Sequence, residues 1–236
     1  MDLETPYRTG MVVVAHADDA EYGCSGTVAK WCRQGMEVVY VICTDGSKGS
    51  SDPEMTAAEL VRIRKEEQRA AGRVLGLKDV VFLGYEDSML QPSLDLRRDI
   101  AREIRRHKPD ILISANPVRS FQGTGYMGHP DHMAAGEATL AAVFPAARDR
   151  MTFPELLQEG LEPHKVREVL IMGRREADKW IDVSDTMDIA LEALKQHVSQ
   201  VGEAEHDFAW MKGWREQDGQ HRGMKYAEGF KHYHLS

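Results

Sequence analysis

Two short clusters of histidine and carboxylate side chains are the groups in this sequence best suited to binding a metal ion. The first reads His-Ala-Asp-Asp-Ala-Glu at 16–21 and directly follows the apolar run at 11–15. The second reads Gly-His-Pro-Asp-His at 128–132 and follows a further apolar run, at 111–113, and a loop. Catalytic zinc sites take three ligands from such side chains and leave one position open for water.

The types and spacing of these residues allow a specific division of roles. His16, Asp19 and His132 could supply a His2Asp ligand set. Adjacent carboxylates in an extended turn point in different directions, so Asp18 can face the bound water as general base. His129 is then left as a general acid or as a donor to a developing oxyanion. Zinc activates water and polarises a carbonyl, which suits amide hydrolysis.

Each cluster also has an ordinary structural explanation. Asp18 and Asp19 are favourable N-cap residues of a helix, and Pro130 is a residue type that is common in a helix's first turn. The residues alone therefore leave both the metal-site and the helix-start interpretations open.

The elements that must position these clusters alternate between apolar runs and helical patterns. Nearly continuous β-branched runs are typical of strands buried on both faces of a parallel sheet, and they predict strands at 12–14, 38–42, 80–83, 111–113, 166–172 and 180–183. Helical periodicity, a capping box and glycine or proline stops predict helices at 56–75, at 93–107, from 129 onward and at 187–201. This order predicts an α/β fold with a Rossmann-like, open, mainly parallel sheet flanked by helices.

Length and composition indicate one domain, 1–236, with a core at about 11–201. Residues 202–236 lack periodicity and are expected to form an irregular C-terminal tail. The net charge of −8 argues against nucleic-acid binding, which needs a concentrated positive field. No apolar run approaches the ~20 residues of a membrane span, and the N-terminus lacks a secretory pattern, so we expect a cytoplasmic protein without a membrane partner.

The two clusters, in this order, resemble the motifs of the LmbE-like (PIG-L) deacetylases. Four further stretches between the clusters are also similar to the family: 44–46, 63–67, 75–76 and 85–88. The similarity covers at least residues 11–140. The resemblance implies a Zn2+-dependent hydrolase that removes an N-acetyl group from a substrate containing N-acetylglucosamine. It also implies zinc ligands at His16, Asp19 and His132, a general base at Asp18, and an acid or electrostatic role for His129.

The resemblance further implies substrate-binding residues outside the clusters. Family members hold sugar hydroxyls with an arginine and an aspartate, which match Arg64 and Asp87 here. Some relatives have a tyrosine two residues before the second motif's first histidine. That place is Met127 in this chain, and Tyr126 stands one residue away. Where the family's first motif usually has proline, this chain has Ala17, which removes no ligand.

The stretch Tyr-Ala-Glu-Gly-Phe at 226–230 resembles the diacetylchitobiose deacetylase branch. Relatives in that branch form oligomers in which a C-terminal histidine reaches a neighbour's site, and His234 is the matching residue. A homo-oligomer with a small amino-sugar substrate is therefore expected.

Alternative functions differ in substrate or in class. A deacetylase of a thiol-cofactor precursor, of the bacillithiol or mycothiol type, or of a natural product would carry the same motifs. A Mg2+-dependent phosphohydrolase would need Asp-x-Asp after the first strand, where His16 stands, and magnesium prefers oxygen ligands. A non-catalytic sugar-binding module fits the fold, although such a module would be expected to have lost a ligand or the base.

Overall fold

A seven-stranded sheet organises the protein. The computed structural model describes residues 7–119, 127–202 and 208–236. Within these ranges the strand order is β3-β2-β1-β4-β5-β7-β6. Adjacent strands from β3 to β5 are parallel, and β7 runs antiparallel to both β5 and β6. The strands are β1 (Thr9–Val14), β2 (Glu37–Thr44), β3 (Asp79–Tyr85), β4 (Ile111–Ser114), β5 (Glu168–Met172), β6 (Lys179–Asp182) and β7 (Ala227–His234). The predicted mainly parallel α/β sheet is confirmed.

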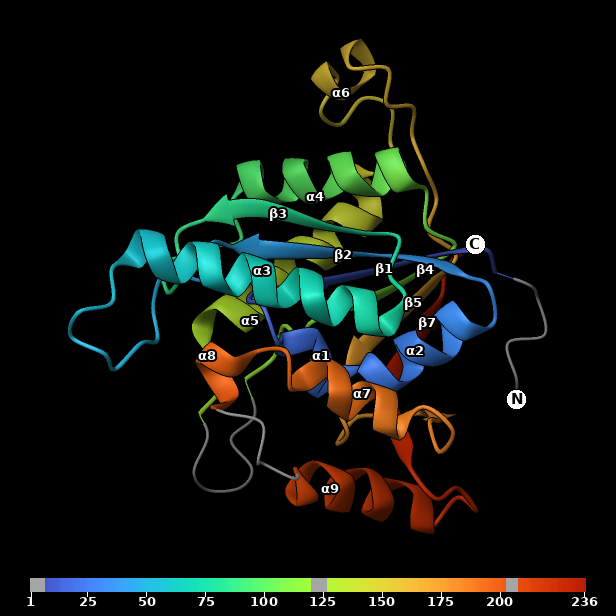
Figure 1. The fold of residues 1–236 in the computed structure, drawn as a ribbon. Coiled ribbons are helices and arrows are strands. Elements are labelled where there is room, and N and C mark those ends of the chain that lie inside the picture. The colour runs from blue at the N-terminus through green and yellow to red at the C-terminus, as the bar shows by residue number, and fades with distance from the viewer. Residues whose placement is uncertain (1–6, 120–126, 203–207) are drawn as a thin grey trace.

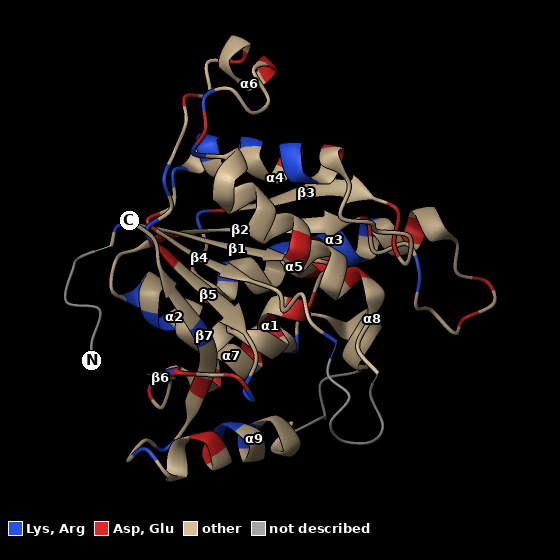
Figure 2. Ribbon diagram, turned by 180° about the vertical axis from the view of Figure 1, so that it is seen from behind, with Lys and Arg blue, Asp and Glu red and all other residues tan. Residues whose placement is uncertain are grey.

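Helices cover both faces of this sheet (Figures 1 and 2). On one face lie α4 (Leu94–His107) and α5 (Pro130–Ala141), which continues into η1 (Ala142–Ala146). The other face is covered by α1 (Asp19–Gly23), α2 (Ser25–Arg33), α3 (Ala57–Leu75) and α7 (Met187–Leu194). Short α6 (Glu155–Gln158) and α8 (Val198–Val201) and the longer α9 (Ala209–Gln220) complete the described helices. No helix in the described part of the chain has the length and apolarity of a membrane span.

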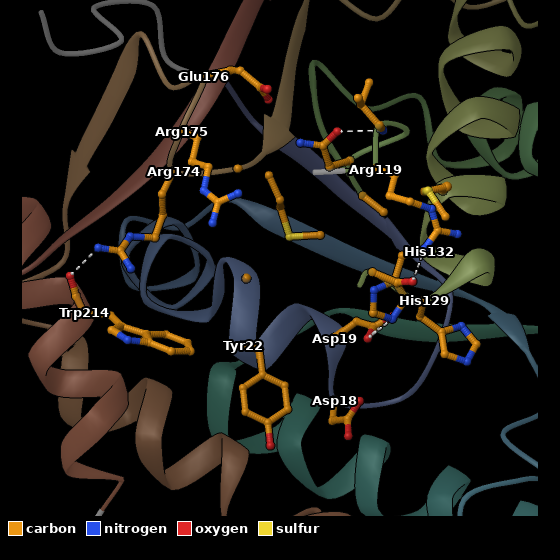
Figure 3. A pocket seen from close by; sticks show the side chains of 18 of the residues that line it. Asp18, Asp19, Tyr22, Arg119, His129, His132, Arg174, Arg175, Glu176 and Trp214 are labelled. Carbon is orange, nitrogen blue, oxygen red and sulfur yellow. Dashed lines mark hydrogen bonds and ion pairs between the residues drawn. The ribbon is translucent and has the colours of Figure 1, made fainter. Parts of the chain in front are cut away.

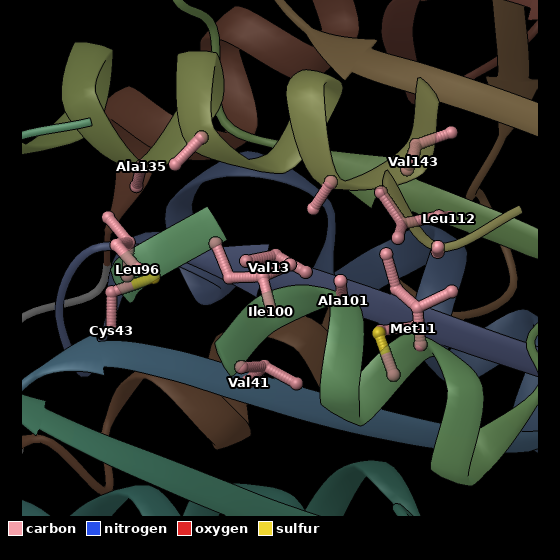
Figure 4. Close-up of a cluster of buried hydrophobic side chains, with 14 of the residues drawn as sticks. Met11, Val13, Val41, Cys43, Leu96, Ile100, Ala101, Leu112, Ala135 and Val143 are labelled. Atoms are coloured by element: carbon pink, nitrogen blue, oxygen red, sulfur yellow. The ribbon is translucent and has the colours of Figure 1, made fainter. Parts of the chain in front are cut away.

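The central strands are apolar at successive positions because both sides of each strand are buried. Met11 and Val13 of β1 pack against Ile100 of α4 and Ala135 of α5 (Figure 4). Val12 of β1 belongs to the second core, beneath α2, α3 and α7. This double burial explains the continuous runs that predicted the strands.

Local signals set the helix ends as predicted. The Thr56 side chain accepts a hydrogen bond from the Glu59 N–H at 3.2 Å, and Gly76 ends α3 with a left-handed φ of 80°. Pro130 begins α5, and the His129 ring accepts a hydrogen bond from the Asp131 N–H. The second histidine cluster is therefore both a helix start and part of the site described below.

Two predictions about the C-terminal third are wrong. Residues 209–220 and 227–234 form α9 and β7 rather than an irregular tail, and β7 is inserted between β5 and β6. Its partners lie far away in the sequence, so no local pattern marked it. The helix expected at 187–201 is two helices, α7 and α8, separated by residues 195–197.

The position of β7 within the sheet predicts a large cost for truncating its buried side chain. Phe230 is fully buried in the second core, which also contains Leu170 of β5, so Phe230→Ala should lower the free energy of unfolding by about 3–5 kcal/mol. Tyr233 on the same strand is 48% exposed, and Tyr233→Ala should change it by about 0.5 kcal/mol. Urea denaturation measures both. Equal, small effects would contradict the burial of this segment.

Candidate functional site

The two histidine clusters meet at the carboxyl ends of β1 and β4. These strands are parallel neighbours, with Val13 opposite Ser114. From β1 the chain passes to β2 on one side, and β4 lies on the other side, so the strand order reverses here. Open α/β sheets bind their ligands at such a switch point. The topology thus brings the turn after β1 and the first turn of α5 to one place.

The carboxylate of Asp19 lies between two imidazoles. Its Oδ1 is 2.9 Å from His132 Nε2, and its Oδ2 is 3.5 Å from His16 Nδ1. The backbone N–H of His16 also donates to Oδ2, at 2.8 Å. One ring nitrogen from each of His16, His129 and His132 lies within 4.8 Å of the others. The three predicted ligands are therefore brought together, with His129 beside them.

Opposite charges are strongly coupled in this cluster. Burial alone would lower the pKa of His16, but hydrogen bonds with Asp19 and Asp87 raise that pKa to about 10. The pKa of His132 is also raised by Asp19, against the effect of burial. Burial would raise the pKa of Asp19, yet the two imidazoles hold it well below its usual range. The Asp19 carboxylate thus stabilises positive charge on the two neighbouring imidazoles.

A second pair of carboxylates holds the other side of the His16 ring. His16 Nε2 is 3.1 Å from Asp87 Oδ1 and 3.3 Å from Asp131 Oδ2. Asp131 is fully buried, and its Oδ2 accepts the Ser88 N–H at 2.7 Å. Metal-bound histidines commonly donate their second ring N–H to a carboxylate, which orients the ring. Asp131, to which the sequence analysis gave no role, is placed to do this.

Asp18 lies in a turn that side chains from other helices support. Its φ of 88° is unusual for a residue with a side chain and carries strain of about 1–3 kcal/mol. The Asp18 N–H donates to Gln68 Oε1 at 3.2 Å, and Gln68 Nε2 donates to Glu21 Oε1 at 3.1 Å. Glu21 Oε2 is 3.3 Å from His197 Nε2. Gln68, Glu21 and His197 are fully buried, so this network fixes the turn from behind.

The environment of Asp18 favours proton transfer near neutral pH. Burial, followed by the charge of Asp19, raises the pKa of Asp18 to about 7, although the Arg64 guanidinium lowers it. Arg64 Nη2 is 3.8 Å from Asp18 Oδ1. A carboxylate whose pKa is close to neutral is well matched to general-base catalysis.

The His129 ring is oriented by its role as the N-cap of α5. Its Nδ1 accepts the Asp131 N–H at 3.2 Å, so the neutral ring carries its proton on Nε2. Burial and the positive charge on His16 lower the pKa of His129. A neutral ring with a proton on Nε2 is suited to donating a hydrogen bond.

Arg64 and Asp87, the expected substrate-binding residues, lie beside the histidine cluster. Both are buried, and neither lines the cavity in front of the histidines. Arg64 Nη2 donates to the carbonyl of Ala17 at 2.9 Å, and Asp87 contacts His16. Although burial opposes it, the hydrogen bond to His16 lowers the pKa of Asp87 to about 2. This geometry lets both residues position the groups around the histidines, and a role in holding sugar hydroxyls stays a prediction.

A cavity of about 1110 Å³ opens in front of the cluster (Figure 3). Asp18, Asp19, His129 and His132 line one side. Residues that the sequence analysis left unassigned line the rest of the wall, among them Tyr22 of α1, Arg174, and Trp210 and Trp214 of α9. The α9 segment therefore contributes to the site although it lies far from both motifs in the sequence.

Two further predicted residues do not contribute to this cavity as described. Tyr126 lies outside the described residues. His234 ends β7 beside the amino end of β5, at the opposite end of the strands from the cavity, where its Nδ1 is 2.8 Å from Glu168 Oε1. His234 is therefore remote from the cavity of its own chain, and a role in a neighbouring subunit's site stays a prediction.

Comparisons with known proteins find similarity to one group of enzymes, the deacetylases. A family model described as PIG-L, GlcNAc-PI de-N-acetylase, matches residues 11–143. The chain is 31% identical over 223 residues to a diacetylchitobiose deacetylase of Thermococcus kodakarensis, covering 94% of this chain and 81% of the relative. It is 30% identical over 195 residues to a probable N-acetyl-alpha-D-glucosaminyl L-malate deacetylase 2 of Bacillus subtilis, covering 80% of this chain and 82% of the relative.

Among solved structures, N,N'-diacetylchitobiose deacetylase from Pyrococcus horikoshii superposes with a TM-score of 0.88. Sequence identity is 27%, and the match covers 99% of this chain and 87% of that one. The likeness therefore extends over both histidine clusters and the C-terminal α9 and β7.

The buried network behind Asp18 predicts a clear stability effect. Gln68→Leu removes both side-chain hydrogen bonds and leaves the Asp18 N–H and Glu21 Oε1 without these partners, so the free energy of unfolding should fall by about 1–3 kcal/mol. Glu66→Gln on the same helix alters only an exposed pair with Arg62 and should cost under about 1 kcal/mol. Denaturant titration compares them. A Gln68→Leu protein as stable as the control would show that the network does not support the turn.

Proposed function

The chain belongs to the PIG-L (GlcNAc-PI de-N-acetylase) family, and on this premise we propose that it is a zinc-dependent enzyme that removes the N-acetyl group from an N-acetylglucosamine-containing substrate. The observation that carries the proposal is the Asp19 carboxylate between His16 and His132, with Asp18 beside it at the cavity wall. The curated relatives named above are deacetylases, so the phosphohydrolase and sugar-binding-module alternatives are set aside.

The donor set fits zinc. Two imidazole nitrogens and one carboxylate are ligands that zinc accepts in catalytic sites, whereas magnesium prefers oxygen alone. His16 Nδ1, an oxygen of Asp19 and His132 Nε2 would hold the ion, and Asp131 and Asp87 would fix the His16 ring. When bound, zinc would supply Lewis-acid activation of a water molecule and of the acetyl carbonyl.

The protein's own groups would carry the protons. Asp18 would accept a proton from the attacking water. The Nε2–H of His129 would donate a hydrogen bond to the carbonyl oxygen as negative charge develops there. Protonated Asp18 would then return its proton to the sugar nitrogen as the carbon–nitrogen bond breaks. The products are acetic acid, which ionises to acetate by giving its proton to the amine or to solvent, and the free amine. Because Asp18 has given up its proton, the base is ready for another cycle once the products leave.

This proposal treats the chain as one deacetylase domain. The cytoplasmic location and the homo-oligomeric assembly expected for the protein stay predictions.

Metal removal tests the proposal. The purified protein should release acetate from N,N'-diacetylchitobiose, and a chelator should abolish the release until zinc is added back. Metal-depleted protein that keeps full activity would contradict the proposal. So would zinc-loaded protein that releases acetate from no N-acetylglucosamine derivative, including its malate and inositol glycosides.

Variants separate metal binding from proton transfer in the same experiment. Asp18→Asn should keep its zinc while kcat falls by about 10²–10⁴-fold, and His16→Ala should lose the zinc itself. His107→Ala is the matched control, because His107 lies on α4 and pairs with Glu103 away from the cavity. It should keep both zinc and turnover. Near-normal turnover by Asp18→Asn would mean that the assigned base is wrong.

A further inference from the structure

Three aromatic side chains from two distant segments line the same cavity as the histidines. Tyr22 comes from α1, and Trp210 and Trp214 come from α9, one helical turn apart. They are 36%, 44% and 49% exposed, respectively. Figure 3 shows Tyr22 between the Asp18–Asp19 pair and Trp214. The aromatic wall therefore begins beside the proposed catalytic groups and extends away from them.

The rings contact one another and form a continuous surface. The Tyr22 and Trp210 ring centroids are 5.8 Å apart with planes at 29°, and those of Trp210 and Trp214 are 4.7 Å apart at 70°. These are stacked and edge-to-face arrangements that aromatic pairs favour. The three rings hold one another in place, so little conformational entropy would be lost when a ligand packs on them.

Buried and paired charges fix α9 against the rest of the site. Arg215 is buried, and its Nη2 donates to the Tyr22 carbonyl at 2.6 Å and lies 3.3 Å from Glu228 Oε1 on β7. Arg174 Nε is 2.6 Å from Asp218 Oδ2. These contacts join α9 to α1, to β7 and to the loop between β5 and β6, which carries Arg174. The aromatic wall is therefore held in place by the surrounding elements.

The size and character of this wall indicate a ligand larger than one sugar. The cavity of about 1110 Å³ exceeds the range of about 300–1,000 Å³ that is usual for small-molecule sites. Large aromatic rings left half-exposed in a cavity wall are suited to covering apolar ligand surface. The C–H face of a pyranose ring presents such a surface, while its hydroxyls stay at the ring's edge.

We propose that Tyr22, Trp210 and Trp214 form a stacking subsite for a second pyranose ring, joined by a glycosidic bond to the sugar that is deacetylated. This inference rests on the proposed function and narrows its substrate class to an oligosaccharide. The cavity's charges favour a neutral ring over an acidic group. Its wall carries four carboxylates against three arginines, so it offers an acidic group no excess of positive charge: Asp18, Asp19, Glu176 and Asp218 against Arg119, Arg174 and Arg175. Arg174 is also paired with Asp218, and Arg119 Nη1 donates to the Gly128 carbonyl at 3.0 Å.

Kinetics on one-sugar and two-sugar substrates test the subsite. Trp214→Ala should lower kcat/KM for N,N'-diacetylchitobiose about tenfold and leave kcat/KM for N-acetylglucosamine within about twofold of wild type. Trp214→Phe, which keeps an aromatic face, should recover most of the loss. Met151→Ala removes a large exposed apolar side chain elsewhere, 84% exposed, and should change neither value. Equal losses on both substrates, or no loss on either, would overturn the subsite.

A binding measurement keeps this test independent of turnover. Calorimetric titration of the zinc-loaded Asp18→Asn protein should show tighter binding of diacetylchitobiose than of N-acetylglucosamine, and Trp214→Ala should remove the difference. This result in a protein whose wild type releases no acetate would support the subsite and contradict the proposed reaction. Equal affinity for the two sugars would overturn the subsite whatever the activity. Tighter binding of N-acetylglucosaminyl malate than of the disaccharide would also overturn it, in favour of an acidic group in this position.

Discussion

The contact of the Asp19 carboxylate with two imidazoles is the interaction on which the site depends. His16 lies in the turn after β1, Asp19 begins α1, and His132 belongs to the first turn of α5, which follows β4. They can meet only because β1 and β4 are neighbours at the point where the strand order reverses. The parallel core of the sheet, with side chains buried on both faces, keeps these two strand ends in register. The chemistry therefore depends directly on the topology.

This arrangement places an unusual amount of charge in a buried setting. The His16 ring faces Asp19 on one side and Asp87 and Asp131 on the other. Burying such groups is costly unless each is paired, and removing one partner leaves an uncompensated charge. The strained Asp18 turn adds to this cost. Arg64 and Gln68 of α3 and His197 before α8 support the turn from behind, so elements outside the two motifs share in positioning the proposed catalytic groups.

The sequence predicted those parts of the site that local patterns encode. His16, Asp19 and His132 could be grouped because each follows a recognisable buried strand, and strand ends of a parallel sheet converge. Asp131 was not distinguishable from an ordinary acidic residue at a helix N-terminus, where the helix dipole favours it. The burial of Arg64 and Asp87 depends on how α3 packs behind the turn, which periodicity does not reveal. The sequence did not predict β7 or the place of Trp210 and Trp214 in the cavity wall, because the contacts of these segments depend on the non-local order of the strands.

The most direct test of the account is the position of the metal. Crystals of the zinc-loaded protein, measured at the zinc absorption edge, should show one anomalous peak within about 2.0–2.2 Å of His16 Nδ1, an Asp19 oxygen and His132 Nε2. A peak at the neighbouring cluster of His16, Asp87 and Asp131, whose ligand atoms also lie within 4.8 Å of one another, would contradict the assigned ligand set. The absence of any peak at the ends of β1 and β4 would contradict the metal-dependent reaction itself.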